Sequence, residues 1–332
     1  MYFIAEIGVN HEASLKKAFK IIMDAKKAGA HAVKFQCYKA EKLASKYANA
    51  YWDKKVEKEN SQLKLYKKFD KFLKSDYKKI FNFCKKIKID FIITPFDLES
   101  VNFFKNKVKY FKISSSDITN LPLIEKVAET KKPVILSTGA SNKFEIKRAL
   151  KILKKKTNKI ILLHCILNYP THRYDANLNM ILDLKKITNN VGLSDHTLSE
   201  NSHEILIYSY LLGVRYIEKH FTDNKKKPGN DHFHSFDKKD LRLFFEKLSH
   251  VQKILGSNIK YSLKSEEISR QNARRSIFYN KDLKLNSKIK TNDLIMLRPA
   301  IGVDPFKYKG FIGKILKSNK KKGDLLDIND FK

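Results

Sequence analysis

The stretch GLSDHTLSENSHEILIYSYLLGVRYIEKHFT, residues 192–222, contains the pattern that decides the fold. Two short apolar runs end in histidines, at His196 and His220, and a segment with helical spacing lies between them. A strand, a crossover helix and a second strand in this order form a unit with parallel strands. The stretch therefore predicts an imidazole at the carboxyl end of each of two successive strands.

The same alternation of β-rich runs and amphipathic segments extends over roughly the first 250 residues, which is typical of an α/β fold of the (β/α)8 TIM-barrel type rather than a doubly wound sheet. Around Cys84, apolar residues recur at helical spacing with lysines on the other face, so Cys84 is expected in the core. Residues 37–74 are expected to form an extended loop over the barrel mouth. The strands are predicted at 2–9, 31–36, 90–96, 110–114, 133–138, 159–165, 190–196 and 216–222.

The chain is expected to divide into two domains. The barrel would cover residues 1–255 and end with a helix at 238–255. Residues 256–273 are predicted to be a linker, because the segment begins Gly-Ser-Asn and is then rich in Lys, Glu and Ser. Short apolar runs separated by turn residues then predict a small β-rich domain at 274–332, small enough to need a partner surface for stability.

The composition excludes several classes of protein. Hydrophobic residues make up 42% of the 332 residues and aromatic residues 11%, too many for a disordered chain. The net charge of +33 comes mostly from lysines scattered over the whole length. A nucleic-acid binder would more often concentrate arginines and aromatic residues on one element, so we expect a solvated basic surface and no nucleic-acid partner.

The sequence also favours a cytoplasmic protein. No apolar run approaches the ~18–20 residues needed to span a bilayer, so no membrane partner is expected. The N-terminus has no basic segment before its first acid, Glu6, and is not expected to be a secretion signal. The three cysteines, Cys37, Cys84 and Cys165, form no CxxC pair, which fits reduced thiols.

Nearly every predicted strand ends in groups that bind anions or metals, or that move protons, and the carboxyl ends of the strands carry the chemistry in such barrels. Singly, each group has a structural explanation: a hydrogen-bonded histidine, a snorkelling lysine or a serine that caps a helix. Together they predict a metal held by two histidines, a phosphate pocket and a buried acid, and hence chemistry on a phosphorylated small molecule. These residues are Glu6, Lys34, Gln36, Thr94, Lys112, Ser115, Asp117, Ser137, Tyr169, His196 and His220.

Eight motifs, in order along the chain, resemble those of the sialic acid synthases, and the resemblance extends to the C-terminal antifreeze-like (SAF) domain of that family. It implies an enzyme that condenses phosphoenolpyruvate with an N-acetylmannosamine-type sugar to a nine-carbon 2-keto-3-deoxy acid and free phosphate. The motifs are IAEIGVNH at 4–11, VKFQ at 33–36, TPFD at 94–97, KISS at 112–115, LSTG at 136–139, LHC at 163–165, GLSDH at 192–196 and EKHFT at 218–222.

The resemblance implies a role for each residue. His196 and His220 would hold one divalent metal, Mn2+ or Mg2+, that polarises the aldehyde oxygen of the open-chain sugar. Glu6 would act as acid and base on the water that adds at C2, and Asp117, where a glutamate is common, is expected to reach an active-site proton. The substrate-binding residues would be Lys34 near the carboxylate of phosphoenolpyruvate, Lys112, Ser115, Ser137 and Ser194 at its phosphate, Gln36, Tyr169 and Asp231 at the sugar, and Thr94 at the barrel mouth.

The resemblance also implies a domain-swapped homodimer. In the family an arginine of the antifreeze-like domain closes the site of the partner subunit, and the matching residue is Arg298. Some positions depart from the family pattern: Leu167, Ala300 and Ile301 replace smaller or polar residues. The loop 228–235 is also unusual, and its His232 and His234 are expected in a solvated or sugar-contacting loop rather than at the metal, which already has two ligands. The sequence leaves the identity of the sugar open.

Two other functions remain as alternatives. One is a phosphoenolpyruvate-condensing barrel that makes a 3-deoxy-octulosonate or -heptulosonate phosphate, but these enzymes act on phosphorylated aldoses and are not expected to carry the antifreeze-like domain. The other is a non-catalytic protein that binds sugars or polyanions. The intact set of acid, lysines and histidines argues against it.

Overall fold

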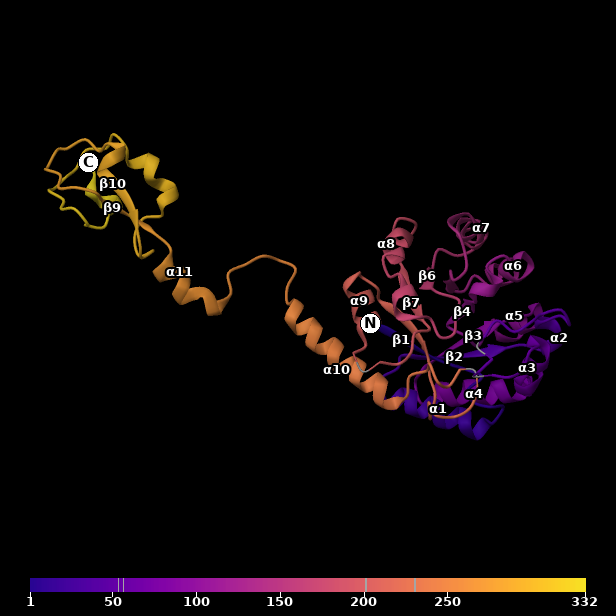
Figure 1. The fold of residues 1–332 in the computed structure, drawn as a ribbon. Coiled ribbons are helices and arrows are strands. Elements are labelled where there is room, and N and C mark those ends of the chain that lie inside the picture. The colour runs from indigo at the N-terminus through magenta and orange to yellow at the C-terminus, as the bar shows by residue number, and fades with distance from the viewer. Residues whose placement is uncertain (53, 56, 201, 230) are drawn as a thin grey trace. The chain divides into compact units, whose positions relative to one another are not determined.

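Eight parallel strands close into a barrel in which each strand pairs with the next and β8 returns to β1 (Figure 1). The structure, a computed structural model, describes every residue except 53, 56, 201 and 230. Each predicted strand is confirmed to within two residues at either end. The strands are β1 (Tyr2–Gly8), β2 (Ala32–Cys37), β3 (Asp90–Pro95), β4 (Tyr110–Ile113), β5 (Val134–Ser137), β6 (Ile160–Cys165), β7 (Val191–Asp195) and β8 (Tyr216–His220).

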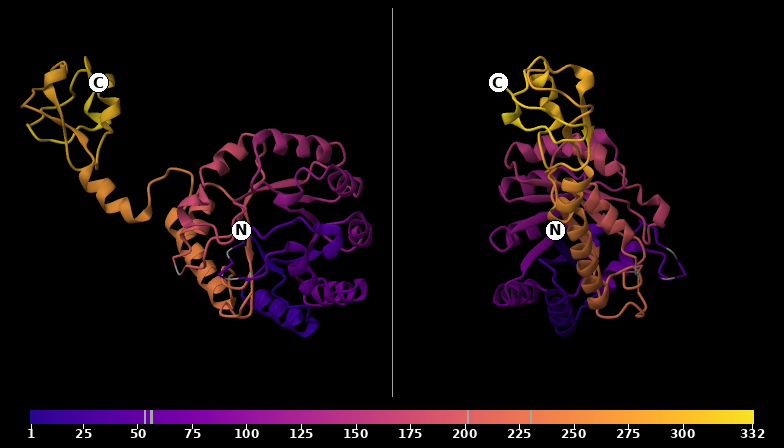
Figure 2. Two further views of the ribbon diagram at one scale, coloured as in Figure 1. Left: turned by 45° about the vertical axis from the view of Figure 1, so that its right-hand side comes forward. Right: turned by 90° about the vertical axis from the view of Figure 1, so that its left-hand side faces the viewer.

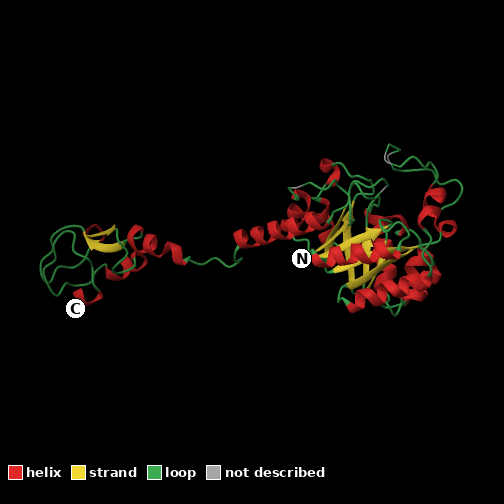
Figure 3. Ribbon diagram, turned by 90° about the horizontal axis from the view of Figure 1, so that it is seen from below, coloured by secondary structure: helices red, strands yellow, loops and turns green. Residues whose placement is uncertain are grey.

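Helices cover the outside of the strands (Figures 2 and 3). Several begin at a side chain that accepts a backbone N–H, such as Ser14 before α1 and Asn142 before α7. The predicted last barrel helix is found as α10. The helices are α1 (Leu15–Lys27), α4 (Lys74–Lys86), α5 (Leu98–Phe104), α6 (Leu121–Glu129), α7 (Lys143–Lys154), α8 (Met180–Lys185), α9 (Glu204–Leu211) and α10 (Lys238–Leu255).

The prediction of an extended loop at 37–74 is wrong in part, because this segment contains α2 (Ala40–Leu43) and α3 (Gln62–Phe69). Ser61 caps α3 by accepting the backbone N–H of Lys64 at 3.4 Å, and Leu65 on this helix is buried. Both helices are too short to show a sustained periodicity in the sequence.

The barrel has two apolar layers, which set the direction of its functional side chains. On β1, Phe3, Ala5 and Ile7 pack outward against the helices, and Ile4 packs inside the barrel. Because successive strand residues point to opposite faces, Glu6 points inward like Ile4. Cys84 belongs to the outer layer, so its predicted place in the core is confirmed.

The chain divides into two compact units, Met1–Ile254 and Leu255–Lys332. The segment 256–273, predicted to be a linker, is helical toward its C-terminal end: a 3-10 turn at Lys264–Glu266 leads into α11 (Glu267–Ala273). Glu266 accepts the backbone N–H of Leu263 at 2.8 Å and so starts this helical segment.

The second unit contains one antiparallel pair, β9 (Ser276–Tyr279) and β10 (Leu294–Leu297), together with isolated bridges and 3-10 turns. Its antifreeze-like identity stays a prediction. It has an apolar core of its own, formed by Ile277, Tyr279, Ile289, Leu294, Phe311, Leu316, Leu326 and Phe331. Within the described part of the chain, none of the helices has the length and apolar character to cross a bilayer.

Candidate active site

A cavity of about 510 Å3 opens at the carboxyl ends of the barrel strands. Every residue predicted for the site lines it, except Arg298. The register of the barrel explains part of this assembly, since Glu6 pairs with Lys34 on β2 and with His220 on β8. The predicted residues on its wall are Glu6, Lys34, Gln36, Thr94, Lys112, Ser115, Asp117, Ser137, Tyr169, Ser194, His196, His220 and Asp231.

Glu6 and Lys34 form a buried ion pair. Lys34 Nζ lies 2.6 Å from Glu6 Oε2, and Gln36 Nε2 donates a hydrogen bond of 3.0 Å to Glu6 Oε1. Lys34 also donates to Thr94 Oγ1 at 3.2 Å. Burial would lower the pKa of Lys34, but the negative charges of Glu218 and Glu6 outweigh it and raise this pKa. Lys34 is therefore a cation at neutral pH.

Glu218 is a central residue of the site that the sequence analysis did not assign. Its Oε1 lies 3.0 Å from Lys112 Nζ and 3.7 Å from Lys34 Nζ, and it accepts a hydrogen bond of 2.9 Å from Ser194 Oγ. Burial opposes ionisation, but Lys112 and Lys34 outweigh it and lower the pKa of Glu218 to about 2. Strand alternation was the available signal, because Glu218 lies two residues before His220 and shares its face.

The predicted phosphate-binding groups differ in their present partners. Burial lowers the pKa of Lys112, although Glu218 opposes this shift. Ser115 Oγ accepts the backbone N–H of Gly139 at 2.9 Å, and Ser194 donates to Glu218. Among the described residues, Ser137 Oγ has no hydrogen-bond partner, and it is 2% exposed. Ser137 is thus a hydroxyl available to a ligand.

Asp117 lines the cavity, but both of its carboxylate oxygens have local partners. It ends the 3-10 turn Ser115–Asp117, where Oδ2 accepts from Ser114 Oγ at 2.9 Å and Oδ1 accepts from Asn120 Nδ2 at 3.0 Å. These bonds hold the turn between β4 and α6. The catalytic role expected for Asp117 stays a prediction.

The two predicted metal ligands lie side by side at the ends of β7 and β8. The ring centroids of His196 and His220 are 5.5 Å apart, and Tyr169 lies 4.2 Å from His196. His196 Nδ1 hydrogen-bonds the carbonyl of Ile166 at 2.8 Å, which leaves Nε2 as the ring nitrogen for another partner. His220 Nδ1 lies 3.4 Å from Asp231 Oδ2.

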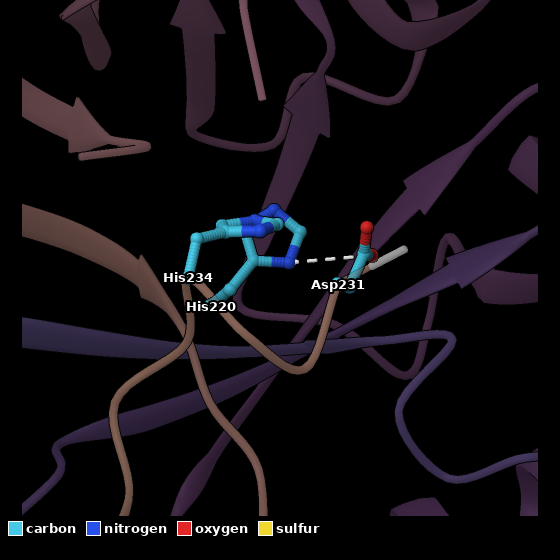
Figure 4. Close-up of side chains that lie close together, drawn as sticks. All are labelled: His220, Asp231 and His234. Atoms are coloured by element: carbon cyan, nitrogen blue, oxygen red, sulfur yellow. Dashed lines mark ion pairs between the residues drawn. The ribbon is translucent and has the colours of Figure 1, made fainter. Parts of the chain in front are cut away.

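Asp231 and His234 belong to the loop that follows β8 (Figure 4). Burial would raise the pKa of Asp231, but His220 outweighs it and holds this pKa well below its usual range. The loop was expected to be solvated or to contact the sugar. Its two histidines are not solvated, since His232 is 3% and His234 0% exposed, and contact with the sugar stays a prediction. His232 Nδ1 hydrogen-bonds Thr222 Oγ1 at 2.7 Å. Among the described residues, neither nitrogen of His234 has a partner.

This donor set fits a divalent ion. His220, Asp231 and His234 can each present one ligand atom such that the three atoms lie within 4.8 Å of one another (Figure 4). The buried nitrogens His220 Nδ1 and His234 Nδ1 and Nε2 lack hydrogen bonds among the described residues. Buried polar groups normally have partners, and neutral imidazoles and carboxylates are common ligands of divalent first-row metals.

Arg298 does not line the cavity described above. It follows β10 in the second unit and is exposed. Its predicted action in the site of a partner subunit stays a prediction. Leu167, one of the departures from the expected pattern, does line the cavity and adds an apolar group to its wall.

Comparisons with known proteins agree with this arrangement. Residues 21–260 match the NeuB family. The N,N'-diacetyllegionaminic acid synthase of Campylobacter jejuni is 38% identical over 97% of this chain and 98% of its own length. The synthase of the same name from Legionella pneumophila is 33% identical over 98% of this chain and 93% of its own length.

A solved structure supports the same assignment. The N-acetylneuraminic acid synthetase of Leptospira borgpetersenii superposes with a TM-score of 0.69 at 33% identity, covering 81% of this chain and 89% of that one. The match at the level of the family thus covers most of the barrel, and the relatives align over nearly the full chain. This chain belongs to the NeuB family.

Proposed function

We propose that this chain is a synthase that condenses phosphoenolpyruvate with an N-acetylmannosamine-type sugar, giving a nine-carbon 2-keto-3-deoxy acid and phosphate. The observation that carries the proposal is a pair of buried lysines, Lys34 and Lys112, held by Glu6 and Glu218 in one cavity beside two imidazoles. The names of the relatives, which are synthases of acidic sugars, support the same class of reaction.

The lysines suit the charges of phosphoenolpyruvate. This substrate carries a carboxylate and a phosphate, and a buried ammonium group interacts more strongly with an anion than an exposed one does. Lys34 would bind the carboxylate, and Lys112 the phosphate together with Ser115, Ser137 and Ser194. Ser137 needs no rearrangement, because its hydroxyl has no other partner among the described residues.

The reaction forms a bond between C3 of phosphoenolpyruvate and the aldehyde carbon of the sugar. Water then adds at C2, and phosphate leaves with cleavage of the bond between C2 and the bridging oxygen. Glu6 would take the proton of this water, because it is a buried carboxylate fixed by Lys34 and Gln36. A divalent ion bound at His196 and His220 would supply a Lewis acid for the aldehyde oxygen.

The apolar part of the cavity supports a particular acceptor. Leu43 from α2, and Leu65, Tyr66 and Phe69 from α3, line the cavity. Apolar side chains favour methyl groups over hydroxyls, because removing methyl surface from water is favourable. We therefore propose a 2,4-diacetamido-6-deoxy sugar as the acceptor in preference to N-acetylmannosamine. The names of the Campylobacter and Legionella relatives support this choice.

A panel of acceptors tests both proposals. The protein is incubated with Mn2+ and phosphoenolpyruvate labelled with 18O in the bridging oxygen, and released phosphate is measured with each sugar. We expect release with the 2,4-diacetamido-6-deoxy sugar above that with N-acetylmannosamine, and the label in the phosphate. Erythrose 4-phosphate and arabinose 5-phosphate serve as controls and should release none. Release with a phosphorylated aldose alone, or with no acceptor at all, would contradict the proposed reaction.

A further inference from the structure

We propose that His234 supplies an additional imidazole ligand to the divalent ion expected at His196 and His220, and that this nitrogen-rich set selects a first-row transition ion over Mg2+. The inference rests on the proposed function for the presence of an ion in this cavity. It concerns which residues of this chain hold the ion and which ion they favour.

The backbone brings His234 to the ion site by closing the loop after β8. Thr222 N donates to Phe236 O at 2.9 Å, and Phe236 N donates to His220 O at 2.8 Å. The two ends of the loop therefore run side by side, and a parallel bridge joins Phe221 to Phe236. His234, two residues before this junction, is thereby returned to the end of β8, with its ring centroid 4.8 Å from that of His220.

The neighbours of His234 fix the same loop. Ser235 is 0% exposed and accepts a hydrogen bond of 3.0 Å from Asn10 Nδ2. Asp231, three residues before His234, faces His220 at 3.4 Å (Figure 4). A position held by buried contacts on both sides suits a metal ligand, whose donor atom must be fixed before the ion arrives.

His234 also lacks another explanation for its polar atoms. Its ring packs near Tyr169 and Phe233, with centroids 5.7 Å and 5.0 Å away, and these contacts would serve an apolar ring equally well. Leaving a buried polar group without a partner costs stability. By contrast His232, on the same loop, hydrogen-bonds Thr222. His234 therefore has ring nitrogens that no described residue uses and that could bind a metal, whereas the Nδ1 atom of His232 is already hydrogen-bonded.

The donor types predict the selectivity. Mg2+ prefers oxygen ligands and keeps several waters, whereas imidazole nitrogen suits first-row transition ions. The structure brings potential ligand atoms of His220, His234 and Asp231 within 4.8 Å of one another, and the expected ligand His196 would be a third imidazole. Each imidazole nitrogen increases the preference of the site for Co2+ or Zn2+ over Mg2+. Loss of one imidazole should therefore reduce the preference for these transition ions over Mg2+.

The test is a titration of the metal-free, full-length protein with Co2+ and with Mg2+, followed by calorimetry and by the visible absorption of Co2+. We compare the wild type with His234→Phe and with His232→Phe, which removes the other histidine of the loop. His234→Phe should weaken Co2+ binding by a factor of about 10 or more, change the Co2+ absorption bands, and affect Mg2+ much less. His232→Phe should retain the wild-type Co2+ bands.

A stability measurement separates lost ligation from misfolding. Because His234→Phe keeps a ring and removes two unpaired nitrogens, the metal-free variant should melt at or above the wild-type temperature, while the increase on adding Co2+ should shrink. Unchanged Co2+ affinity and absorption in His234→Phe would overturn the proposal, including the case in which only the KM of the sugar changes. Absence of Co2+ binding to the wild type would overturn it as well.

The titrations contain no substrate, so they distinguish this inference from the proposed reaction. Co2+ binding that depends on His234, in a protein that releases no phosphate with any acceptor, would sustain the ligand assignment and contradict the synthase. Phosphate release by the wild type, together with unaltered Co2+ binding in His234→Phe, would support the synthase and contradict the assignment of His234 as a ligand.

Discussion

Glu6 is held from two sides inside the barrel, by Lys34 at 2.6 Å and by the amide of Gln36 at 3.0 Å. It is 1% exposed, so water reaches it only through the cavity. A carboxylate fixed in this way keeps a single orientation toward the cavity. That is a requirement for proton transfer to a water at a defined position.

Glu6→Gln should therefore keep substrate binding and lose turnover. The amide has the same shape and can still accept from Gln36, but it cannot take a proton. We expect kcat to fall by a factor of about 100 to 10,000, with KM for both substrates within a few-fold of the wild type. Steady-state phosphate release measures both constants.

The matched control is Glu12→Gln, since Glu12 lies in the turn that follows β1 and does not line the cavity. It should leave kcat near the wild-type value. A Glu6→Gln variant with unchanged kcat and raised KM would make Glu6 a binding residue instead.

His11 gives the stability of the barrel a dependence on pH. It is 3% exposed, its ring stacks on Phe72 with centroids 4.3 Å apart, and its Nδ1 accepts the backbone N–H of Ala13 at 3.0 Å. Burial lowers the pKa of His11 from 6.5 to about 4. The folded state thus keeps His11 neutral at pH values where the unfolded chain protonates it. This contribution to stability is complete above pH 6.5 and is lost as the pH falls toward 4.

His11→Phe keeps the stacking and removes the titration. Between pH 7 and pH 4, the free energy of unfolding of the wild type should fall by up to roughly 3 kcal/mol more than that of the variant. Urea denaturation at the two pH values measures this difference. His172→Phe, at an exposed histidine, should retain the wild-type dependence. An equal fall in His11→Phe and the wild type would show that His11 does not carry the effect.

At the scale of elements, Glu218 connects four strands across the inside of the barrel. From β8 it contacts Lys112 on β4, Lys34 on β2 and Ser194 on β7. All four side chains are at most 5% exposed. Two lysines that are both buried would repel each other, and Glu218 is the carboxylate between them. The network therefore couples the geometry of the phosphate site to the closure of the barrel.

Glu218→Gln should destabilise the protein by about 3–5 kcal/mol, because it leaves buried cations without their counter-charge. Adding Lys112→Met should restore part of this loss, since one of the unpaired cations is then removed. The measurement is urea denaturation of the single and double variants. The control is Glu99→Gln, which breaks the exposed pair with Lys42 and should leave the midpoint unchanged. A single variant as stable as the wild type would contradict the coupling.

The barrel could be predicted from the sequence because its strands are short β-rich runs at regular intervals, as around His196 and His220. The helices within the segment 37–74 could not be predicted, because α2 and α3, of 4 and 8 residues, are too short to repeat an apolar pattern. The helix α11, at the end of the predicted linker, was not predicted. All of its residues are exposed and most are polar or charged, so they show no apolar stripe at helical spacing.

The candidate site was predictable where a residue type has few uses at a strand end, as for Lys34, Lys112 and the two histidines. Glu218 was not predicted as a site residue, because its role follows from its contacts with side chains on strands that are distant in the sequence. His234 was expected in a solvated or sugar-contacting loop, and not at the metal, because nothing in the sequence reveals that Phe236 pairs with the end of β8. Both misses concern long-range pairing, which periodicity does not report.

At the scale of the whole molecule, the chain consists of the barrel and a compact second unit, Leu255–Lys332. It has its own apolar core, and Arg298 is exposed immediately after β10. A neighbouring arginine, Arg275, has a structural role, since its Nη1 donates to Met296 O at 2.9 Å. The resemblance to the sialic acid synthases suggests for Arg298 the role of closing the active site of a partner subunit.

If Arg298 acts in the partner subunit, Arg298→Ala should raise the KM of the sugar by a much larger factor than that of phosphoenolpyruvate, because its planar guanidinium would orient the sugar. Arg270→Ala, at an exposed arginine of α11, is the control and should leave both constants unchanged. The decisive measurement mixes Arg298→Ala with Glu6→Gln under conditions of subunit exchange. In a domain-swapped dimer, each mixed dimer holds one site with both defects and one with neither. An equal mixture should then recover about a quarter of the wild-type activity. If each Arg298 served its own barrel instead, every site in the mixture would carry one defect, and activity would stay at the level of the separate variants.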